Sequence, residues 1–266
     1  MELVYWAGIR GLAYPIQLFL ESHSIEYTYT PIKYDRNTWP VDKRAGKLDL
    51  KEIPFQCLPV LKVKDEESGE TVALGETHAI LRYLEAKYGR QQELSLITQA
   101  RVDALFSHAE FFVERTFYRS ASPTWLDPPK RDETIADVYM PFLRSMEHAL
   151  QDEKTVEALW HKSGDGLRPS AAACFVAAAF TMLTDIMPFS FARSSTLKSK
   201  KNGGQANKTL ASQFPACDQL VTDVEACPGV QKWFEGVTDE WSLSPPFAAH
   251  LVREAAERWD KVGAGQ

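Results

Sequence analysis

The chain changes character near residue 88, and this change constrains its fold more than any other feature of the sequence. Before that point, short runs rich in β-branched and aromatic residues alternate with segments of helical periodicity. From about residue 93 the periodicity is helical throughout. We therefore expect two domains, an α/β domain over residues 1–88 and an all-helical domain over residues 93–266.

The first domain has the pattern of a small mixed sheet with helices packed on it. Four runs have the composition of strands, at residues 3–7, 25–31, 58–63 and 71–74. A helix is expected from Pro15 onward, and a second begins after Gly75. The order is β-α-β, a long irregular link and then β-β-α, which implies a mixed four-stranded sheet.

The second domain is expected to consist of helices joined by loops. Amphipathic or apolar periodicity predicts helices at residues 94–118, 132–153, 170–186, 214–227, 230–240 and 246–262. The apolar run at 170–183 is too short to span a bilayer comfortably and indicates a buried helix. Residues 194–212 are rich in lysine and glycine and poor in apolar residues, which indicates a mobile surface loop.

Composition excludes several classes of function. Of 266 residues, 44% are hydrophobic, and the formal net charge is -6, with no long basic block, so a nucleic-acid partner is not expected. The N-terminus lacks the pattern of a secretory signal. The four cysteines form no C-x-x-C motif and no zinc spacing with histidine. We therefore expect a cytoplasmic protein with no metal site and no membrane partner.

Four stretches together resemble one known family. Residues 5–13 read YWAGIRGLA, residues 34–59 contain Y-D-R-x-x-W-x-x-x-K and later F-x-x-L-P, and residues 76–84 read ETHAILRYL. Residues 214–233 add F-P and P-G-V-x-x-W. The set resembles the cytosolic glutathione S-transferases of the tyrosine type, and the N-terminal half is closest to the mu class. The match covers most of residues 3–88 and is weaker in the helical half.

The resemblance implies a thioredoxin-like domain, glutathione as substrate or cosubstrate, and Tyr5 as the catalytic residue. A free thiol has a pKa of about 8.5, so little of it is thiolate at neutral pH. A hydroxyl that donates to the sulfur favours the thiolate and activates it as a nucleophile. The alternative for Tyr5 is an ordinary core tyrosine at the end of a strand.

The resemblance also assigns residues that bind glutathione. Trp39 and Lys43 would hold the glycine carboxylate, because both are hydrogen-bond donors that cannot accept. The Leu58–Pro59 bond is expected to be cis, and the Leu58 backbone would pair with the ligand's cysteine. Glu76 would hold the ammonium group, and Thr77 with its helix N-terminus the γ-glutamyl carboxylate. The alternatives are an exposed lysine loop, an ordinary proline at a strand start and a simple helix cap at Thr77.

The second substrate, a small hydrophobic electrophile or polyene, should lie between the two domains. The residues that we expect to line its pocket are Trp6, Ala7, Gly8 and Ile9 from the sheet, and Phe111, Phe112 and Arg115 from the long helix. Aromatic residues at helical spacing are more often core than pocket. Family resemblance further implies a homodimer, in which Phe55 would insert into the partner.

The chain also departs from the family pattern. One extra residue stands at Ala7–Gly8, next to the proposed catalytic hydroxyl, and Cys57 replaces an amide side chain. The partner-reaching aspartate is replaced near Ser107–His108, and Ala173 stands where a capping aspartate belongs, which leaves Ser170 alone to cap.

These departures leave three functions open. The first is conjugation of glutathione to an electrophile. The second is glutathione-dependent cis–trans isomerisation in a dedicated biosynthetic step, in which the thiolate adds to a conjugated double bond and leaves again. The third is binding of glutathione or a hydrophobic ligand without catalysis, which the insertion beside Tyr5 keeps open.

Overall fold

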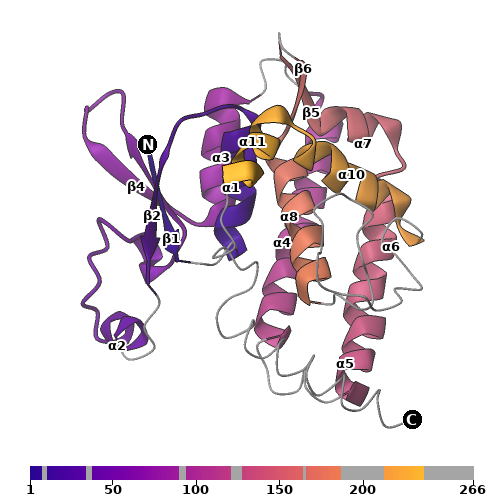
Figure 1. Ribbon diagram of the computed structural model, residues 1–266, viewed down its shortest axis with the longest axis horizontal. Helices are drawn as coiled ribbons and strands as arrows, with labels where there is room; N and C mark the ends of the chain where they lie inside the picture. Colours follow the sequence, from indigo (N-terminus) through magenta and orange to yellow (C-terminus); the bar gives the residue numbers. More distant parts are fainter. Residues whose placement is uncertain are drawn as a thin grey trace.

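The computed structural model describes residues 1–7, 11–33, 38–89, 94–120, 128–163, 166–186 and 213–236. The predicted loop at 194–212, the predicted helix at 246–262 and the residues Gly8, Ile9 and Arg10 lie outside these ranges. In the described part, a sheet domain lies at one end and a helical domain at the other (Figure 1).

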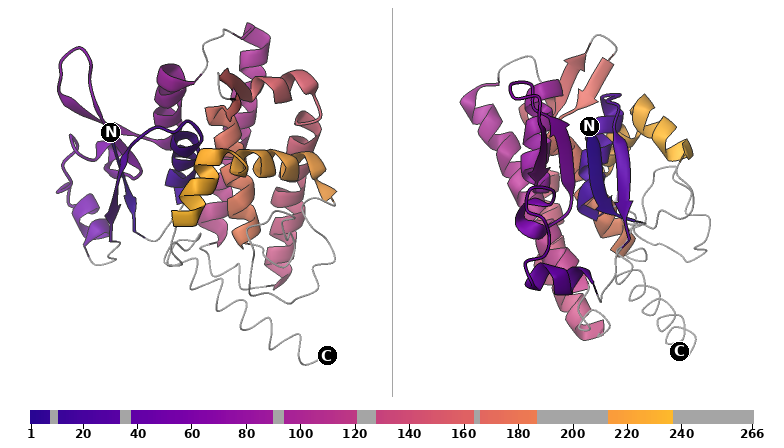
Figure 2. Two further views of the ribbon diagram at one scale, coloured as in Figure 1. Left: turned by 45° about the horizontal axis from the view of Figure 1, so that its top comes forward. Right: turned by 90° about the vertical axis from the view of Figure 1, so that its left-hand side faces the viewer.

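The predicted mixed four-stranded sheet is confirmed. Its strands are β1 (Glu2–Trp6), β2 (Thr28–Ile32), β3 (Val60–Lys64) and β4 (Thr71–Gly75), in the order β2-β1-β3-β4. β1 pairs parallel with β2 and antiparallel with β3, and β3 pairs antiparallel with β4. The right-hand view of Figure 2 shows these strands in front of the helices. β1 is therefore a central strand, and its last residues, Tyr5 and Trp6, extend past the ladder with β3 and pair with β2 alone.

Two helices separate the sheet from the helical domain, and a third lies apart from them. α1 (Tyr14–Ser22) and α3 (Thr77–Tyr88) lie between the two domains, whereas the short α2 (Trp39–Arg44) lies at the outer end of the sheet (Figure 1). α1 packs against α3, α8 and α11 and is almost entirely buried. A helix apolar on all sides is expected in such a position. The two domains thus share one continuous core.

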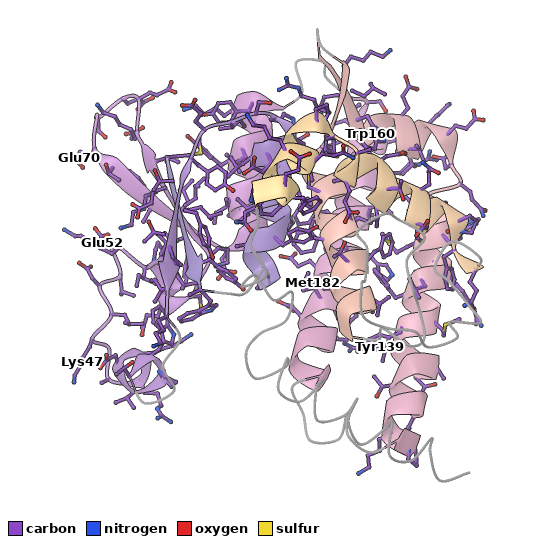
Figure 3. The ribbon with its side chains drawn as sticks, in the orientation of Figure 1. Lys47, Glu52, Glu70, Tyr139, Trp160 and Met182 are labelled. Atoms are coloured by element: carbon purple, nitrogen blue, oxygen red, sulfur yellow. The ribbon has the colours of Figure 1, made fainter. Side chains whose placement is uncertain are left out.

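The second domain is helical, as predicted, and is built around one buried helix. Its helices are α4 (Leu96–Ser120), α5 (Pro128–Thr134), α6 (Met140–Ala149), α7 (Glu153–Ala158), α8 (Ala171–Ile186), α10 (Pro215–Glu225) and α11 (Pro228–Gly236). Residues 171–183 of α8 are all buried, which explains its apolar sequence. Figure 3 shows Met182 and Tyr139 among these helices, whereas Lys47, Glu52 and Glu70 lie on the outer side of the first domain. Within the described residues, no helix combines the length and apolarity that crossing a membrane requires.

Two features of the helical domain differ from the predictions. The predicted helix at 132–153 contains a π-helical turn (Ile135–Tyr139) and ends at Ala149, before the separate α7. Pro141, in the first turn of α6, has no N–H to donate to the preceding turn, which accounts for the wider π turn there. The chain also forms a hairpin that the sequence did not predict, from β5 (Trp160–Ser163) and β6 (Gly166–Pro169).

Carboxylates from other helices cap the starts of α8 and α10. Glu85 of α3 accepts the Ala171 N–H at 2.6 Å, and the Ser170 hydroxyl accepts the Ala173 N–H at 3.1 Å. Glu147 of α6 likewise accepts two N–H groups at the start of α10, at 3.1 and 3.0 Å. Ser170 therefore caps α8 as expected, and Glu85 accepts a further N–H of the first turn from the sheet domain. The Ser170 N–H, which a carboxylate at position 173 would accept, donates instead to the Leu159 carbonyl at 2.8 Å.

Candidate functional site

The Tyr5 hydroxyl is held in place by the backbone. The side chain is 3% exposed, and its oxygen accepts the Leu12 N–H at 3.0 Å. Burial raises the pKa of Tyr5 well above its ordinary value of 10, and the Leu12 N–H only partly opposes this rise. The hydroxyl therefore keeps its proton at neutral pH, and no described residue accepts that proton. Within the described residues Tyr5 is thus a hydrogen-bond donor without an acceptor, an arrangement that suits an anionic ligand.

Trp6 points away from Tyr5 and toward α2. Successive side chains of a strand point to opposite faces. The Trp6 ring meets the Trp39 ring edge-on, with centroids 4.6 Å apart, and its backbone carbonyl accepts the Tyr29 hydroxyl at 2.9 Å. Ala7 continues the pairing with β2 through its N–H, which donates to the Ile32 carbonyl at 2.8 Å. The contact between the Trp6 and Trp39 rings places Trp39, a predicted glutathione ligand, at the end of the strand that carries Tyr5.

Lys43 lies beside Cys57. The Lys43 ammonium donates to the Cys57 sulfur at 3.2 Å, and this contact lies at the surface of the protein. The sequence analysis named both Lys43 and Cys57 but did not predict their contact. The spacing between the two residues in the sequence does not determine how far apart they lie in the fold. An ammonium has three N–H donors, so the contact with Cys57 leaves others for a carboxylate.

The predicted cis bond between Leu58 and Pro59 is confirmed. β3 begins one residue later, at Val60, and the ladder with β1 ends at the Val4–Val60 pair. Leu58 is partly buried and lies just beyond that ladder, at the same edge as the end of β1.

Glu76 and Thr77 form the start of α3, as the sequence predicts. Glu76 is exposed, precedes the helix with φ 66° and ψ 120°, and its carbonyl accepts the Ile80 N–H at 2.9 Å. A positive φ is strained for any residue other than glycine, and residues with such backbone strain are concentrated at functional sites. The first-turn N–H groups that follow have no acceptor within the helix and favour an anion.

Thr77 does not cap its own helix. Its side chain is buried, and its hydroxyl donates to the Leu12 carbonyl at 3.1 Å. In this structure the Thr77 proton is donated within the protein, and the N–H groups of the first turn of α3 are the donors directed to a carboxylate. Leu12, which no motif singled out for a role, joins Tyr5 to the start of α3 through its N–H and its C=O.

The structure corrects one residue of the predicted second-substrate pocket. Phe112 is 3% exposed and stacks on Phe142, with ring centroids 3.8 Å apart. A ring stacked in the core does not line an open pocket. Phe111 is instead 51% exposed, and the Arg115 guanidinium lies 4.3 Å above its ring.

Two of the cavities that the described residues form lie in the helical domain, away from these residues. One, of about 770 Å³, lies between α4, α6 and the start of α7, with Ala104, Leu105 and Met146 as apolar lining. The other, of about 1360 Å³, lies between the start of α4, α7 and the β5–β6 hairpin, and includes Trp160 and Cys227. Neither is lined by any of the predicted glutathione or second-substrate residues that the structure describes.

Comparison with known proteins identifies the fold. No family model matches the sequence, and no curated protein matches it either. Solved structures do match. The sigma-class glutathione S-transferase of Fasciola hepatica has a TM-score of 0.63 at 16% identity, over 90% of this chain and 97% of that one. Rat hPGDS, complexed with a quinoline, has a TM-score of 0.61 at 18% identity, over 91% and 98%.

A third match is Na-GST-3 of Necator americanus, a glutathione S-transferase described as monomeric. It has a TM-score of 0.59 at 20% identity, over 90% of this chain and 97% of that one. The chain therefore has the two-domain fold of the glutathione S-transferases, with a thioredoxin-like sheet domain and an all-helical domain.

Proposed function

We propose that this chain is a glutathione transferase of the tyrosine type, which activates the glutathione thiol for attack on a hydrophobic electrophile. The observation that carries the proposal is the Tyr5 hydroxyl, fixed by the Leu12 N–H with its own proton free of any described acceptor. Donated to the sulfur, that proton stabilises the thiolate and lowers the thiol pKa. The fold supports the proposal, because its neighbours are glutathione S-transferases.

The charged ends of glutathione fit the ends of this site. The first turn of α3 would bind the γ-glutamyl carboxylate with its free N–H groups, and Glu76 would hold the ammonium. Lys43 and Trp39 would bind the glycine carboxylate at the other end. The Leu58 backbone would pair with the central cysteine, beside Tyr5.

The second substrate would bind beside the thiol, between the end of β1 and α4. Trp6 and Ala7 would contribute from the sheet, with Gly8 and Ile9 as further candidates outside the described residues. Phe111 and Arg115 would contribute from α4, since both are exposed. A cytoplasmic location is part of the proposal, because all four cysteines are unpaired.

Product analysis tests the reaction. The protein is incubated with glutathione and, in separate reactions, a hydrophobic electrophile or a conjugated polyene, and products are identified by mass spectrometry. A glutathione adduct would support conjugation. A polyene of unchanged mass and altered geometry would show the same thiolate acting as an isomerase. Glutathione binding with neither product would replace the transferase by a binding protein.

The proposal includes a homodimer in which Phe55 inserts into a second copy. Phe55 is 69% exposed in a loop whose backbone holds it at φ 57°. The cavity of about 770 Å³ between α4 and α6 is large enough for a ring, and Ala104, Leu105 and Met146 are the apolar residues that would contact it. Replacing Phe55 by alanine should weaken the dimer about 30-fold, the effect of losing one such anchor residue.

Sedimentation equilibrium measures this effect. Leu96→Ala is the control, because Leu96 is an exposed apolar residue of α4 outside the cavity lining. A monomeric wild type, or a Phe55→Ala dimer as stable as the wild type, would rule out this mode of association.

A further inference from the structure

The backbone of Leu12 forms hydrogen bonds with both the catalytic candidate Tyr5 and the first residue of α3, Thr77. Leu12 lies in a single 3₁₀ turn, Gly11–Ala13, that leads into α1. Its N–H donates to the Tyr5 hydroxyl at 3.0 Å, and its C=O accepts the Thr77 hydroxyl at 3.1 Å. Both side chains are buried, so water does not compete for these bonds.

The hydroxyl of Thr77 has no local role that would explain its bond. In helix interiors, threonine donates to the carbonyl four residues earlier, as Thr181 does to Ala177 at 2.9 Å. Thr77 is the first residue of α3, where the preceding turn supplies no such carbonyl. Its proton instead goes to a residue 65 positions away. The bond thus ties the start of α3 to the turn that holds Tyr5.

The hydrogen bond from Thr77 restrains this turn at a point where the preceding residue is a glycine. Gly11 adopts φ 39°, a conformation that glycine tolerates but does not enforce. Glycine at this position therefore does not by itself fix the orientation of the peptide unit that carries the Leu12 N–H. A hydrogen bond on the Leu12 carbonyl restrains the residue from its other side and keeps the N–H directed at Tyr5.

We propose that Thr77 is a positioning residue for Tyr5, acting through the backbone of Leu12. The inference rests on the proposed function for its catalytic consequence, because Tyr5 is there the donor to the glutathione sulfur. An N–H donated to a phenolic oxygen polarises the O–H bond and makes its proton a better donor. Thr77 also stands at the N-terminus proposed to bind the γ-glutamyl carboxylate, so the same residue lies beside the proposed carboxylate site and acts on the donor to the central thiol.

Thr77→Val tests the inference, since valine keeps the shape and removes the hydroxyl, and Thr77→Ser is the rescue variant. The thiolate absorbance of bound glutathione is followed against pH. With Thr77→Val we expect a roughly tenfold lower thiolate fraction on the acid side of the titration, the effect of one hydrogen bond. The KM for glutathione should change less than kcat, because the N–H donors of α3 remain. Thr77→Ser should restore the wild-type curve.

A double-mutant cycle shows whether Thr77 acts through Tyr5. In the Tyr5→Phe background, Thr77→Val should have no further effect on the thiolate fraction. Additive effects, equal losses in the valine and serine variants, or a valine curve like that of the wild type would each overturn the inference.

Hydrogen exchange separates this inference from the proposed function, because it needs no glutathione. The Leu12 amide of the free protein should exchange about tenfold faster in Thr77→Val and in Tyr5→Phe than in the wild type. Unchanged exchange in Thr77→Val would overturn the positioning role, whatever the protein does with glutathione. Faster exchange in a protein that generates no thiolate would support the link and refute the transferase.

Discussion

Replacing Gly229 by alanine should destabilise the protein by about 3 kcal/mol, at the upper end of the usual cost of overpacking. A Cβ at this position would stand 1.9 Å from the Glu21 carbonyl oxygen and 2.9 Å from its carbon. Both are backbone atoms of α1, so no side-chain rotation relieves the contact. α11 would have to move away from α1, the helix whose first residues follow the turn that holds Tyr5.

Gly236 provides the matched control on the same helix. A Cβ there would meet nothing within 4 Å, so Gly236→Ala should be neutral or slightly stabilising. Urea unfolding of the two variants and the wild type measures the difference. A Gly229→Ala midpoint equal to that of Gly236→Ala would contradict the close packing of α1 and α11.

Acidification should destabilise the protein between pH 6.5 and pH 4 through His23. Burial lowers the pKa of this side chain from 6.5 to about 4, and the nearby His161 and Arg168 act in the same direction, while the Phe19 carbonyl and Glu85 oppose it. The unfolded chain therefore binds a proton in this range that the folded protein excludes. The contribution of neutral His23 to the free energy of unfolding is fully present above pH 6.5 and is lost as the pH falls toward 4. It amounts to roughly 3 kcal/mol.

The geometry around His23 explains why a proton is unfavourable there. The side chain is 7% exposed, its Nδ1 lies 2.9 Å from the Phe19 carbonyl oxygen, and its Nε2 has no described partner. The β5–β6 hairpin brings Arg168, which donates to the His23 carbonyl at 2.8 Å, and His161, which pairs with Glu85 of α3 at 2.9 Å. A charge on His23 would face the Arg168 guanidinium and the His161 ring, and among the described residues Glu85 is the carboxylate that opposes their effect.

Urea unfolding at a series of pH values tests the role of His23. In His23→Asn the unfolding free energy should fall less steeply between pH 6.5 and 4, because up to one fewer proton is bound on unfolding. His148→Asn, at an exposed site on α6, should have the pH dependence of the wild type. Equal pH dependence in wild type and His23→Asn would contradict this assignment.

Local patterns in the sequence predicted the sheet and the order of the domains, because their periodicity is strong and their neighbours are close in the chain. The β5–β6 hairpin was missed for a physical reason. Its buried residue His161 is polar and is accommodated by Glu85, which is far away in sequence. The same distance concealed the cap that Glu85 provides to α8.

In the candidate site, too, the features set by local sequence were predicted and the contacts between distant residues were not. The cis bond at Pro59, which the family resemblance implies, and the helix start at Glu76 are both confirmed. Phe111 and Phe112 are adjacent aromatic residues of one helix, and the sequence does not say which of the two faces the core. The bond from Thr77 to Leu12 depends on tertiary packing alone, so no local pattern could have predicted it.

The central claim is that Tyr5 donates its proton to a glutathione thiolate, and an ultraviolet pH titration of the complex tests it most directly. Glutathione is added to the wild type and to Tyr5→Phe, while calorimetry records binding to each. The wild type should show thiolate absorbance well below pH 8.5, the ordinary range of a free thiol, and Tyr5→Phe should bind glutathione without that signal. Equal thiolate signals in the two proteins, or no binding of glutathione by the wild type, would contradict the claim.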